Sequence, residues 1–292
     1  MSNTNKTLAD YAISYKMSVA TFNPTATVKE VKLAAAKEFG CREDQTTGTV
    51  YLVLKEYTKE LTEKVRQIRN FFDVNTIKLG DIDIIPSMNF WRVSEFVTQE
   101  IPLFDKLAED FANRWESEIK PNSIAELKRL GVILQNKNVK AWKLTPAELS
   151  EKIYFRFTKT PIGDVNTLKN LQGLTDDLRS SFEADLLAQQ ADVAERANAE
   201  INSRLKKVLE TFSKKMKGLK EGSRIHDSIV TNIGELVELI PSLVVGDNEE
   251  IIELAREAQL LTNWDVDILK DSEPARKEAV RAADDILEKL KF

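Results

Sequence analysis

The residues that most often carry out catalysis are scarce in this sequence, which has one cysteine, Cys41, and one histidine, His226, among 292 residues. Structural zinc sites need four cysteine or histidine ligands and catalytic sites usually need three, so this pair can form neither. Asp227 and Ser228 follow His226 on a predicted helix, where adjacent side chains point to different faces and cannot form a catalytic triad. We therefore expect no catalytic residues and no zinc site.

Two pairs of aspartates have a spacing that suits a metal ion. Asp81 and Asp83 lie two residues apart in a strand-like segment, which places both carboxylates on one face, and Asp265 and Asp267 repeat the spacing in a helical context. Such carboxylates bind magnesium or calcium, but neither pair has a third ligand nearby in the sequence. Surface turns explain both pairs better. Because there is no glycine-rich phosphate loop either, we expect no metal and no other cofactor.

The composition favours a mainly helical chain with a real core. Apolar residues make up 42% of the sequence, whereas there are only ten glycines and eight prolines. No apolar run reaches the roughly 18 residues of a membrane span, and the polar start does not resemble a secretion signal. These features predict a cytoplasmic protein with no membrane contact. The net charge of −5 neither requires nor forbids a nucleic-acid partner.

The periodicity of the apolar residues predicts a mainly α fold, an elongated helical bundle with a long helical arm and a minor two-stranded antiparallel β element. Apolar and polar residues alternate from Ile13 to Val19 and again from Ile153 to Phe157, which is typical of strands. We expect these two strands to pair with each other. Two strands alone are only marginally stable in water, so the pair must pack against helices.

Helical spacing predicts most of the remaining elements. A capping box at 27–30 and a glycine at position 40 bracket the first helix. Apolar residues at steps of three or four predict further helices over 49–72 and 87–120, with Pro102 bending or dividing the second. Near the end of the chain, the same spacing predicts helices over 223–239, before Pro241, and then over 248–261 and 274–290.

A long amphipathic helix dominates the second half of the chain. From Leu171 to Leu219, apolar residues recur about every 3.7 positions. A helix of this length would extend about 70 Å, longer than a compact domain of this size is wide. The segment is either one extended arm or two helices with a break near Gln189 and Gln190. We expect three regions: a mixed helical region with the β element (1–163), the arm (164–222) and a C-terminal helical region that packs on it (223–292).

Charge is unevenly distributed along this helix. The stretch 164–200 is mainly acidic, whereas 201–220 contains seven basic residues and one acidic residue, Glu210. The helix dipole favours this polarity, and the acidic segment from Asp247 onwards is a candidate for covering the basic half. Otherwise the basic patch is a candidate site for an acidic protein or a nucleic acid. Its residues are Arg204, Lys206, Lys207, Lys214, Lys215, Lys217, Lys220 and Arg224.

The apolar stripe of such a long helix must be covered by something. The C-terminal helices, a second copy of the chain or a foreign partner could each cover part of it. The acidic C-terminal helices are complementary in charge to the basic half of the long helix and would cover its apolar stripe there. The N-terminal part of the stripe is then available for another contact. We therefore predict self-association through Leu174, Leu178, Phe182 and Leu186.

Four features follow one another along the chain: the early strand, the strand Tyr154-Phe155-Arg156-Phe157-Thr158 that ends at Pro161, the long helix, and the segment Arg224-Ile225-His226-Asp227-Ser228-Ile229-Val230-Thr231-Asn232-Ile233. This order resembles an uncharacterised family of phage and bacterial proteins known only as a domain of unknown function. Its members are often encoded near MoxR-type AAA+ ATPases and von Willebrand A-type proteins, which implies a role in a multi-protein assembly. The family has no established catalytic residues, so the resemblance transfers none.

These observations favour a non-enzymatic interaction or scaffold protein, phage-encoded by the resemblance, that acts in a multi-protein assembly. Its partner would be another protein, with an AAA+ ATPase as the candidate that the resemblance implies, or a second copy of the chain. The alternative is a nucleic-acid-binding accessory protein that uses the basic patch. Salt dependence separates the two, because counterion release makes nucleic-acid binding weaken steeply as salt rises.

Overall fold

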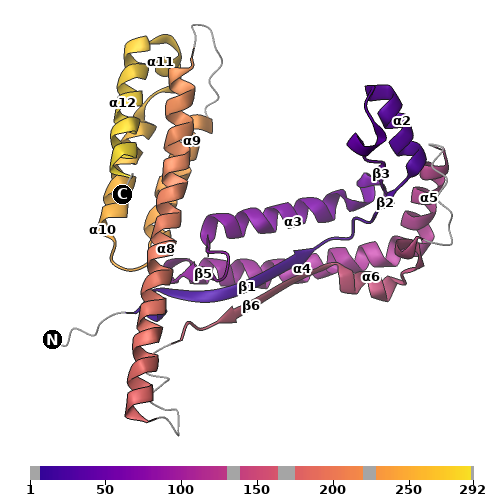
Figure 1. Cartoon of the computed structure of the whole chain (residues 1–292), viewed down its shortest axis with the longest axis horizontal. Helices are drawn as coiled ribbons and strands as arrows, with labels where there is room; N and C mark the ends of the chain where they lie inside the picture. The colour runs from indigo at the N-terminus through magenta and orange to yellow at the C-terminus, as the bar shows by residue number, and fades with distance from the viewer. Residues whose placement is uncertain (1–6, 130–138, 164–174, 220–227, 291–292) are drawn as a thin grey trace. The chain divides into compact units, whose positions relative to one another are not determined.

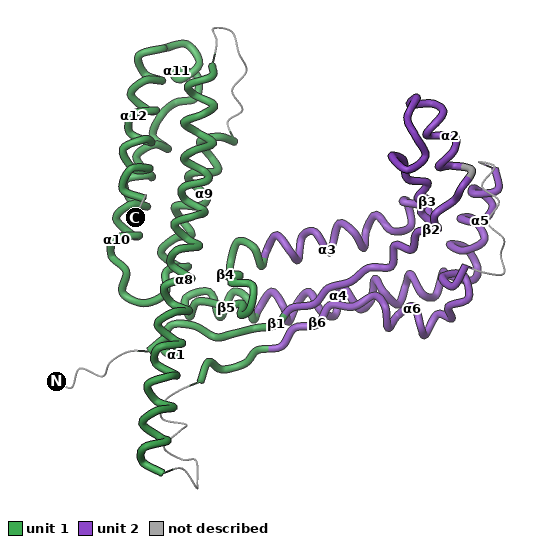
Figure 2. The backbone as a smooth tube through the Cα atoms, in the orientation of Figure 1, with its two compact units in different colours: residues 1–16, 72–94, 159–292 green, residues 17–71, 95–158 purple. Residues whose placement is uncertain are grey.

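The protein is mostly helical, as the sequence predicts (Figure 1). The residues that the computed structural model describes are 7–129, 139–163, 175–219 and 228–290. They form two compact units, each built from segments that are distant in the sequence (Figure 2). Unit 1 comprises 1–16, 72–94 and 159–292, and unit 2 comprises 17–71 and 95–158. The three consecutive regions expected from the sequence divide the chain differently.

Unit 1 contains the long helix and the C-terminal helices. The elements that lie wholly within it are α1 (Leu8–Tyr11), β4 (Ile77–Lys78), β5 (Asp83–Pro86), α8 (Asp176–Lys217), α9 (Ser228–Leu243), α10 (Glu249–Gln259), α11 (Val266–Asp271) and α12 (Glu273–Lys289). Both α9 and α12 pack along α8, and α10 packs on α9 (Figure 1). Unit 1 is therefore a helical bundle around the long helix, with two short strands attached.

Unit 2 is formed by shorter elements together with parts of four longer ones. Wholly within it lie β2 (Thr25–Thr27), α2 (Lys29–Phe39), β3 (Thr49–Tyr51), α5 (Lys120–Arg129) and α6 (Pro146–Lys152). The chain passes from one unit to the other within β1 (Ala12–Ala20), α3 (Lys55–Asn75), α4 (Phe90–Arg114) and β6 (Tyr154–Thr160). Aromatic rings fill part of its core, where Phe22 packs edge-on against Trp115 at 5.6 Å between ring centroids.

The β structure is larger than the two-stranded element that the sequence predicts. The two predicted strands, β1 and β6, are neighbours as expected, but β5 and β4 extend the sheet in the order β4-β5-β1-β6. Ala12 lies opposite Pro86 in the antiparallel β1–β5 pair, and β2 and β3 form a separate antiparallel pair. The sequence indicates a strand-like segment around Asp81 and Asp83, where β5 begins, but it does not predict how that segment pairs. The strands β2, β3 and β4 are only two or three residues long, too short for a clear alternation.

The start of α2 also differs from the prediction, and so does the start of α3. Val28 rather than Thr27 is the N-cap residue of α2. Thr27 is instead paired with Thr49 in the two-stranded sheet, and the Val28 amide donates to the Gly48 carbonyl at 2.8 Å. Since β3 takes up the residues after Gly48, α3 begins only at Lys55, six residues later than its predicted start.

Two prolines lie inside helices. We expected Pro102 to bend or divide its helix, and we expected the other helix to end before Pro241. α4 continues through Pro102, and a π-helical segment at Trp115–Ile119 joins it to α5. α9 continues through Pro241 to its last residue. A proline inside a helix removes one backbone hydrogen bond, but packing can offset that loss. In α9 the neighbouring residues Ile240 and Leu243 are fully buried, so core packing holds the final turn in place.

The long helix α8 is a single helix of 42 residues, which corresponds to about 63 Å. Of the two alternatives that the sequence left open, the unbroken helix is correct. Gln190, at the suspected break, is buried within the helix, and its side-chain amide donates to the carbonyl of Gly163. Thr175 caps the helix by accepting a hydrogen bond from the Leu178 amide. Acidic residues in the first turn and lysines in the last turn complement the helix dipole.

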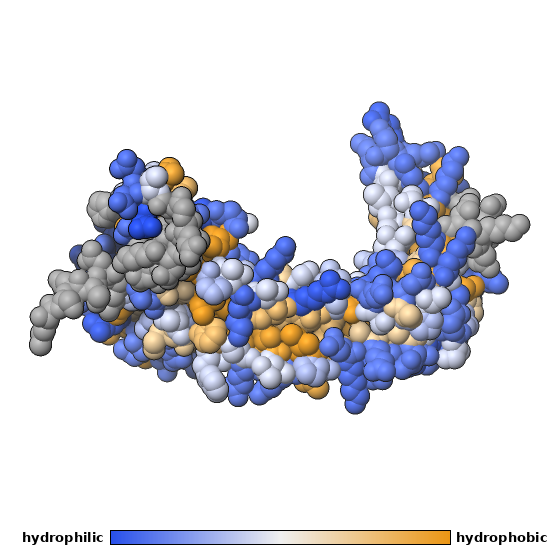
Figure 3. Space-filling view, turned by 90° about the horizontal axis from the view of Figure 1, so that it is seen from below, coloured by the Kyte–Doolittle hydropathy of each residue, from blue (hydrophilic) through white to orange (hydrophobic). Residues whose placement is uncertain are grey.

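From Val193 onwards, one side of α8 is buried in the core of unit 1. Ile201, Leu205 and Leu209 are completely buried in a cluster to which α9 and α12 also contribute. Lys206 lies next to Leu205 in the sequence but is exposed, which confirms the predicted helical phase. Large apolar side chains also remain on the surface elsewhere. Figure 3 shows one face, on which hydrophobic residues gather in patches among hydrophilic ones.

Candidate functional site

The six described residues of the predicted basic patch occupy two different environments. Arg204 and Lys217 are bound to other parts of unit 1, as described below. Lys220 and Arg224 lie outside the described residues. The other four lysines are exposed, and none of them forms an ion pair within the part of the chain that the structure describes; they are Lys206, Lys207, Lys214 and Lys215.

Arg204 links α8 to the end of α3. Its Nη1 and Nη2 donate to the carbonyls of Asp73 and Thr76 at 2.9 and 3.1 Å, and its Nε lies 3.2 Å from Oε1 of Glu200. Only 20% of the side chain is exposed. The guanidinium thus satisfies carbonyls near the C-terminus of a helix, where a positive charge is favourable. We assign Arg204 a structural role.

Lys217 is bound by the C-terminal helix α12. Its Nζ lies 2.7 Å from Oδ2 of Asp284, and the hydroxyl of the buried Ser213 donates to Oδ1 of the same carboxylate at 2.7 Å. An acidic residue of the C-terminal segment therefore neutralises one lysine in the basic half of α8. The exposed lysines of α8 lie outside this contact.

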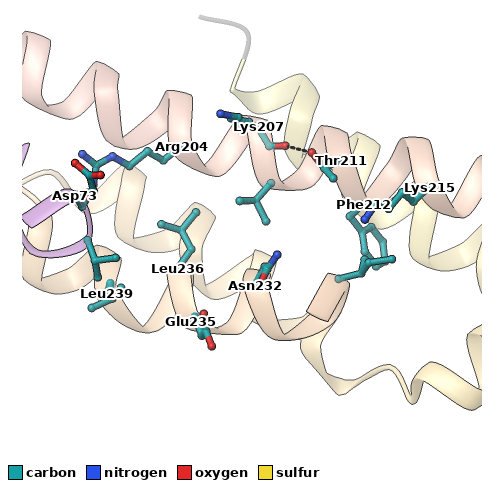
Figure 4. Close-up of a pocket in the computed structure, with 13 residues that line it drawn as sticks. Asp73, Arg204, Lys207, Thr211, Phe212, Lys215, Asn232, Glu235, Leu236 and Leu239 are labelled. Carbon is teal, nitrogen blue, oxygen red and sulfur yellow. Dashed lines mark hydrogen bonds between the residues drawn. The ribbon is translucent and has the colours of Figure 1, made fainter. Parts of the chain in front are cut away.

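A groove of about 440 Å³ lies between α8 and α9 (Figure 4). Its floor is apolar and combines Val208 and Phe212 of α8 with Ile229, Leu236 and Leu239 of α9. Phe212 and Ile229 are buried, whereas the other three side chains are partly exposed. An occupant would therefore bury apolar surface that the fold itself leaves accessible.

The rim of the groove is polar, and its charges are divided between two walls (Figure 4). Lys207 and Lys215 lie on the α8 wall, eight residues apart, which corresponds to about 12 Å of helix rise. Thr211 lies between them, and its hydroxyl donates to the Lys207 carbonyl at 2.7 Å. The α9 wall carries the exposed residues Asn232 and Glu235, and within the described residues Glu235 forms no ion pair. The α8 wall is thus positive and the α9 wall negative.

Both other charged groups at the groove are already neutralised. Asp73 forms an ion pair with Lys78, and Arg204 is paired with Glu200. The charges that remain for a ligand are therefore those of the two α8 lysines and of Glu235.

The residues predicted to mediate self-association differ in their exposure. Leu174 lies outside the described residues. Leu178 and Phe182 are 50% and 46% exposed, whereas Leu186 is half-buried and lines a second cavity of about 380 Å³. Gln190 also lines this cavity, and its Oε1 is buried without a hydrogen-bond partner among the residues that the structure describes.

The aspartate pairs are occupied by contacts within the protein. Asp81 binds Arg196 through two hydrogen bonds of 2.7 and 3.2 Å, which lower the pKa of its carboxyl, while burial raises the pKa of Asp83. Asp265 caps α11, and Asp267 forms an ion pair with Lys270. Within the described residues, no three His, Cys, Asp or Glu side chains come together in a way that could hold a metal ion.

Tyr15 is a buried titratable group that the sequence did not single out. Its Oη lies 2.6 Å from Oγ1 of Thr76, and burial raises the pKa of Tyr15 to about 12. The Thr76 hydroxyl donates its own proton to the Phe72 carbonyl at 2.6 Å, so Tyr15 must be the donor to Thr76. The phenol therefore acts as a neutral structural donor in unit 1.

The α9 wall of the groove is the part of the site that sequence reasoning missed. Asn232, Glu235 and Leu236 are ordinary residues of an amphipathic helix, and no local signal shows that they line the same groove as Lys207 and Lys215. Only the packing of α9 along α8 brings them together.

The described residues include no helix with the length and apolarity that a membrane span needs. No protein-family model matches this chain, and neither a curated protein nor a solved structure matches it significantly.

Proposed function

We propose that this chain is a non-enzymatic interaction protein that binds an acidic protein partner through the exposed lysines of α8. The observation that carries the proposal is the contrast within one helix. Arg204 and Lys217 are bound by groups of unit 1, whereas Lys206, Lys207, Lys214 and Lys215 are exposed without an ion pair in the described residues. Positive charges on a rigid helix accelerate association with an acidic surface and select against basic ones.

The resemblance to the phage and bacterial family supports a role in a multi-protein assembly. Its members are often encoded near MoxR-type AAA+ ATPases, so an ATPase of this type is the candidate partner that the resemblance implies. The proposal includes phage origin and an assembly in the cytoplasm of the host cell.

Nucleic acid is the alternative ligand for the same lysines, because phosphate groups would also pair with them. Single-stranded nucleic acid is usually bound by aromatic side chains that stack on the bases. Phe212, the aromatic residue within the basic stretch, is buried and cannot stack. The acidic protein partner is therefore the better candidate.

Affinity capture with matched charge variants tests the proposal. The tagged full chain is incubated with lysate of its host cell, alongside a variant in which Lys206, Lys207, Lys214 and Lys215 are all changed to glutamate. The matched control carries the same change at four exposed lysines of unit 2 that also lack an ion pair in the described residues: Lys37, Lys59, Lys106 and Lys128.

We expect the wild type and the unit 2 variant to retain the same protein after nuclease treatment, and the α8 variant to lose it. Equal capture by all three proteins would refute the proposal. Binding of a short DNA duplex that requires the α8 lysines and weakens steeply with salt would favour the nucleic-acid alternative. Circular dichroism of each variant verifies that the charge changes leave the helices folded.

A further inference from the structure

We propose that the groove between α8 and α9 binds an amphipathic helix of the protein partner, with acidic residues along one flank and a basic residue on the other. This inference rests on the proposed function, because Lys207 and Lys215 of the groove belong to the same set of exposed lysines. It specifies which kind of segment of the partner binds there. The apolar floor and the divided charges of the rim carry the argument.

The backbone of α8 and α9 favours a helical occupant over an extended one. An extended peptide gains affinity by adding to a sheet edge, where free amides and carbonyls are available. The groove walls are helices, whose backbone groups are already bonded within the helix. Side chains alone can therefore hold the ligand, and an amphipathic helix presents a continuous apolar stripe that packs into a groove between two helices.

The floor defines the apolar face of that helix. Val208, Leu236 and Leu239 are partly exposed in the groove, and Phe212, which also lines it, is buried. A helix that places apolar residues at positions i, i+3 or i+4, and i+7 covers about two turns, the same length as the wall between Lys207 and Lys215.

The charges on the two walls of the groove define the residues required on the two flanks of the bound helix. Because Lys207 and Lys215 are eight residues apart, acidic residues seven or eight positions apart on the partner would face both of them. Glu235 on the opposite wall would face a lysine or arginine, and Asn232 beside it can accept or donate a hydrogen bond.

This division of charge also argues against other anionic ligands in the groove. A nucleic acid or the head group of a lipid would pair with the two lysines but would bring its phosphates close to Glu235, which is an unfavourable contact of like charges. A polypeptide can carry both signs of charge on one helix and so match both walls.

The chain supplies a matched control for the test. Lys206 and Lys214 lie one residue before the groove lysines, on the same helix and with the same spacing, but they do not line the groove. Changing either pair to glutamate alters the net charge equally. Only the groove pair should change the affinity for a helix that lies in the groove.

Fluorescence anisotropy with designed peptides tests the inference on the full chain. The first peptide is an amphipathic helix with glutamates on one flank of a leucine stripe and a lysine on the other. The second peptide carries lysines on both flanks, so it brings like charges to Lys207 and Lys215 in either direction of the helix. We expect the wild type to prefer the first peptide and Lys207→Glu/Lys215→Glu to bind it about tenfold more weakly, whereas Lys206→Glu/Lys214→Glu changes the affinity less than about threefold. The groove variant should also gain affinity for the second peptide.

Three results would overturn the inference. Equal weakening by the two double variants would show that the lysines act only through net charge. A dimer in light scattering that the first peptide dissociates would assign the groove to a second copy of the chain. Failure of both peptides to bind, while capture from lysate still depends on Lys207 and Lys215, would mean that the partner does not present a helix; the proposed function would then stand without this inference. If that capture were also unchanged, the proposed function itself would fail.

Discussion

Replacing Arg204 with methionine should destabilise unit 1 strongly, although the residue looks in the sequence like one more member of a basic patch. Methionine keeps an apolar stem of similar length but removes the hydrogen bonds to the carbonyls of Asp73 and Thr76. Asp73 is exposed, so water can replace its lost bond. Thr76 is fully buried, and a buried carbonyl that loses its donor costs about 1–3 kcal/mol.

The ion pair with Glu200, whose side chain is 39% exposed, adds about 0.5 kcal/mol. Together with the partial cost at Asp73, we expect Arg204→Met to lower the free energy of unfolding by about 2–4 kcal/mol. Lys207→Met, three residues further along the same helix, should change it by about 0.5 kcal/mol or less, because Lys207 is exposed and has no ion pair in the described residues. Arg204→Lys should lie between them, since an ammonium cannot reproduce the planar fork that reaches two carbonyls.

Hydrogen exchange measured peptide by peptide is the suitable assay, because it reports on unit 1 separately, whereas a whole-chain unfolding curve combines both units. If the core of α8 exchanges through unfolding of unit 1, a loss of 2 kcal/mol accelerates its exchange about thirtyfold in Arg204→Met. The matched Lys207→Met variant should exchange at the wild-type rate. Equal rates in the two variants would refute the structural role of Arg204.

Three further outcomes follow from the same structure. The pKa of Tyr15 is about 12 in the folded protein and about 10 when unfolded, so the wild type should lose up to about 2.7 kcal/mol of stability as pH rises from 10 to 12. Tyr15→Phe should lack that loss, and parallel declines in urea unfolding would contradict the assignment. The lowered pKa of Asp81 means that its contact with Arg196 stabilises the protein at neutral pH and is lost as the pH falls below the ordinary range of an aspartate carboxyl. Asp81→Asn should therefore show a smaller decrease in melting temperature on acidification, and equal decreases would mean that the contact contributes nothing. Light scattering should detect an oligomer that Leu178→Glu and Phe182→Glu disperse, whereas a monomer in all three proteins would exclude self-association through these side chains.

The elements that the sequence predicts well are those whose pattern repeats over many residues. The stripe of α8 is long enough to establish its phase, so the burial of Leu205 and the exposure of Lys206 follow from spacing alone. β4 and β5 together have six residues, too few for an alternation that would also predict their pairing. Tertiary packing also overrides local rules, as the unbroken helix at Pro241 illustrates.

The candidate site is less predictable than the fold because its parts come from distant segments. The sequence correctly indicates that lysines gather on the second half of α8, but it cannot distinguish Arg204 from Lys207. That distinction depends on the carbonyls of Asp73 and Thr76, more than 120 residues away along the chain. The position of Glu235 opposite the lysines likewise depends on how α9 packs.

The discontinuous composition of unit 1 has a consequence for the way the chain is synthesised. Ile77 and Ile84 emerge from the ribosome early, yet they belong to the same core cluster as Val193 and Ile201 of α8. At about 5–20 residues per second, the ribosome needs several seconds to produce the intervening hundred or so residues. During that interval, the apolar surface of the nascent strands has no native cover. Newly made chains are therefore exposed to aggregation and to chaperone binding until the C-terminal third has been translated.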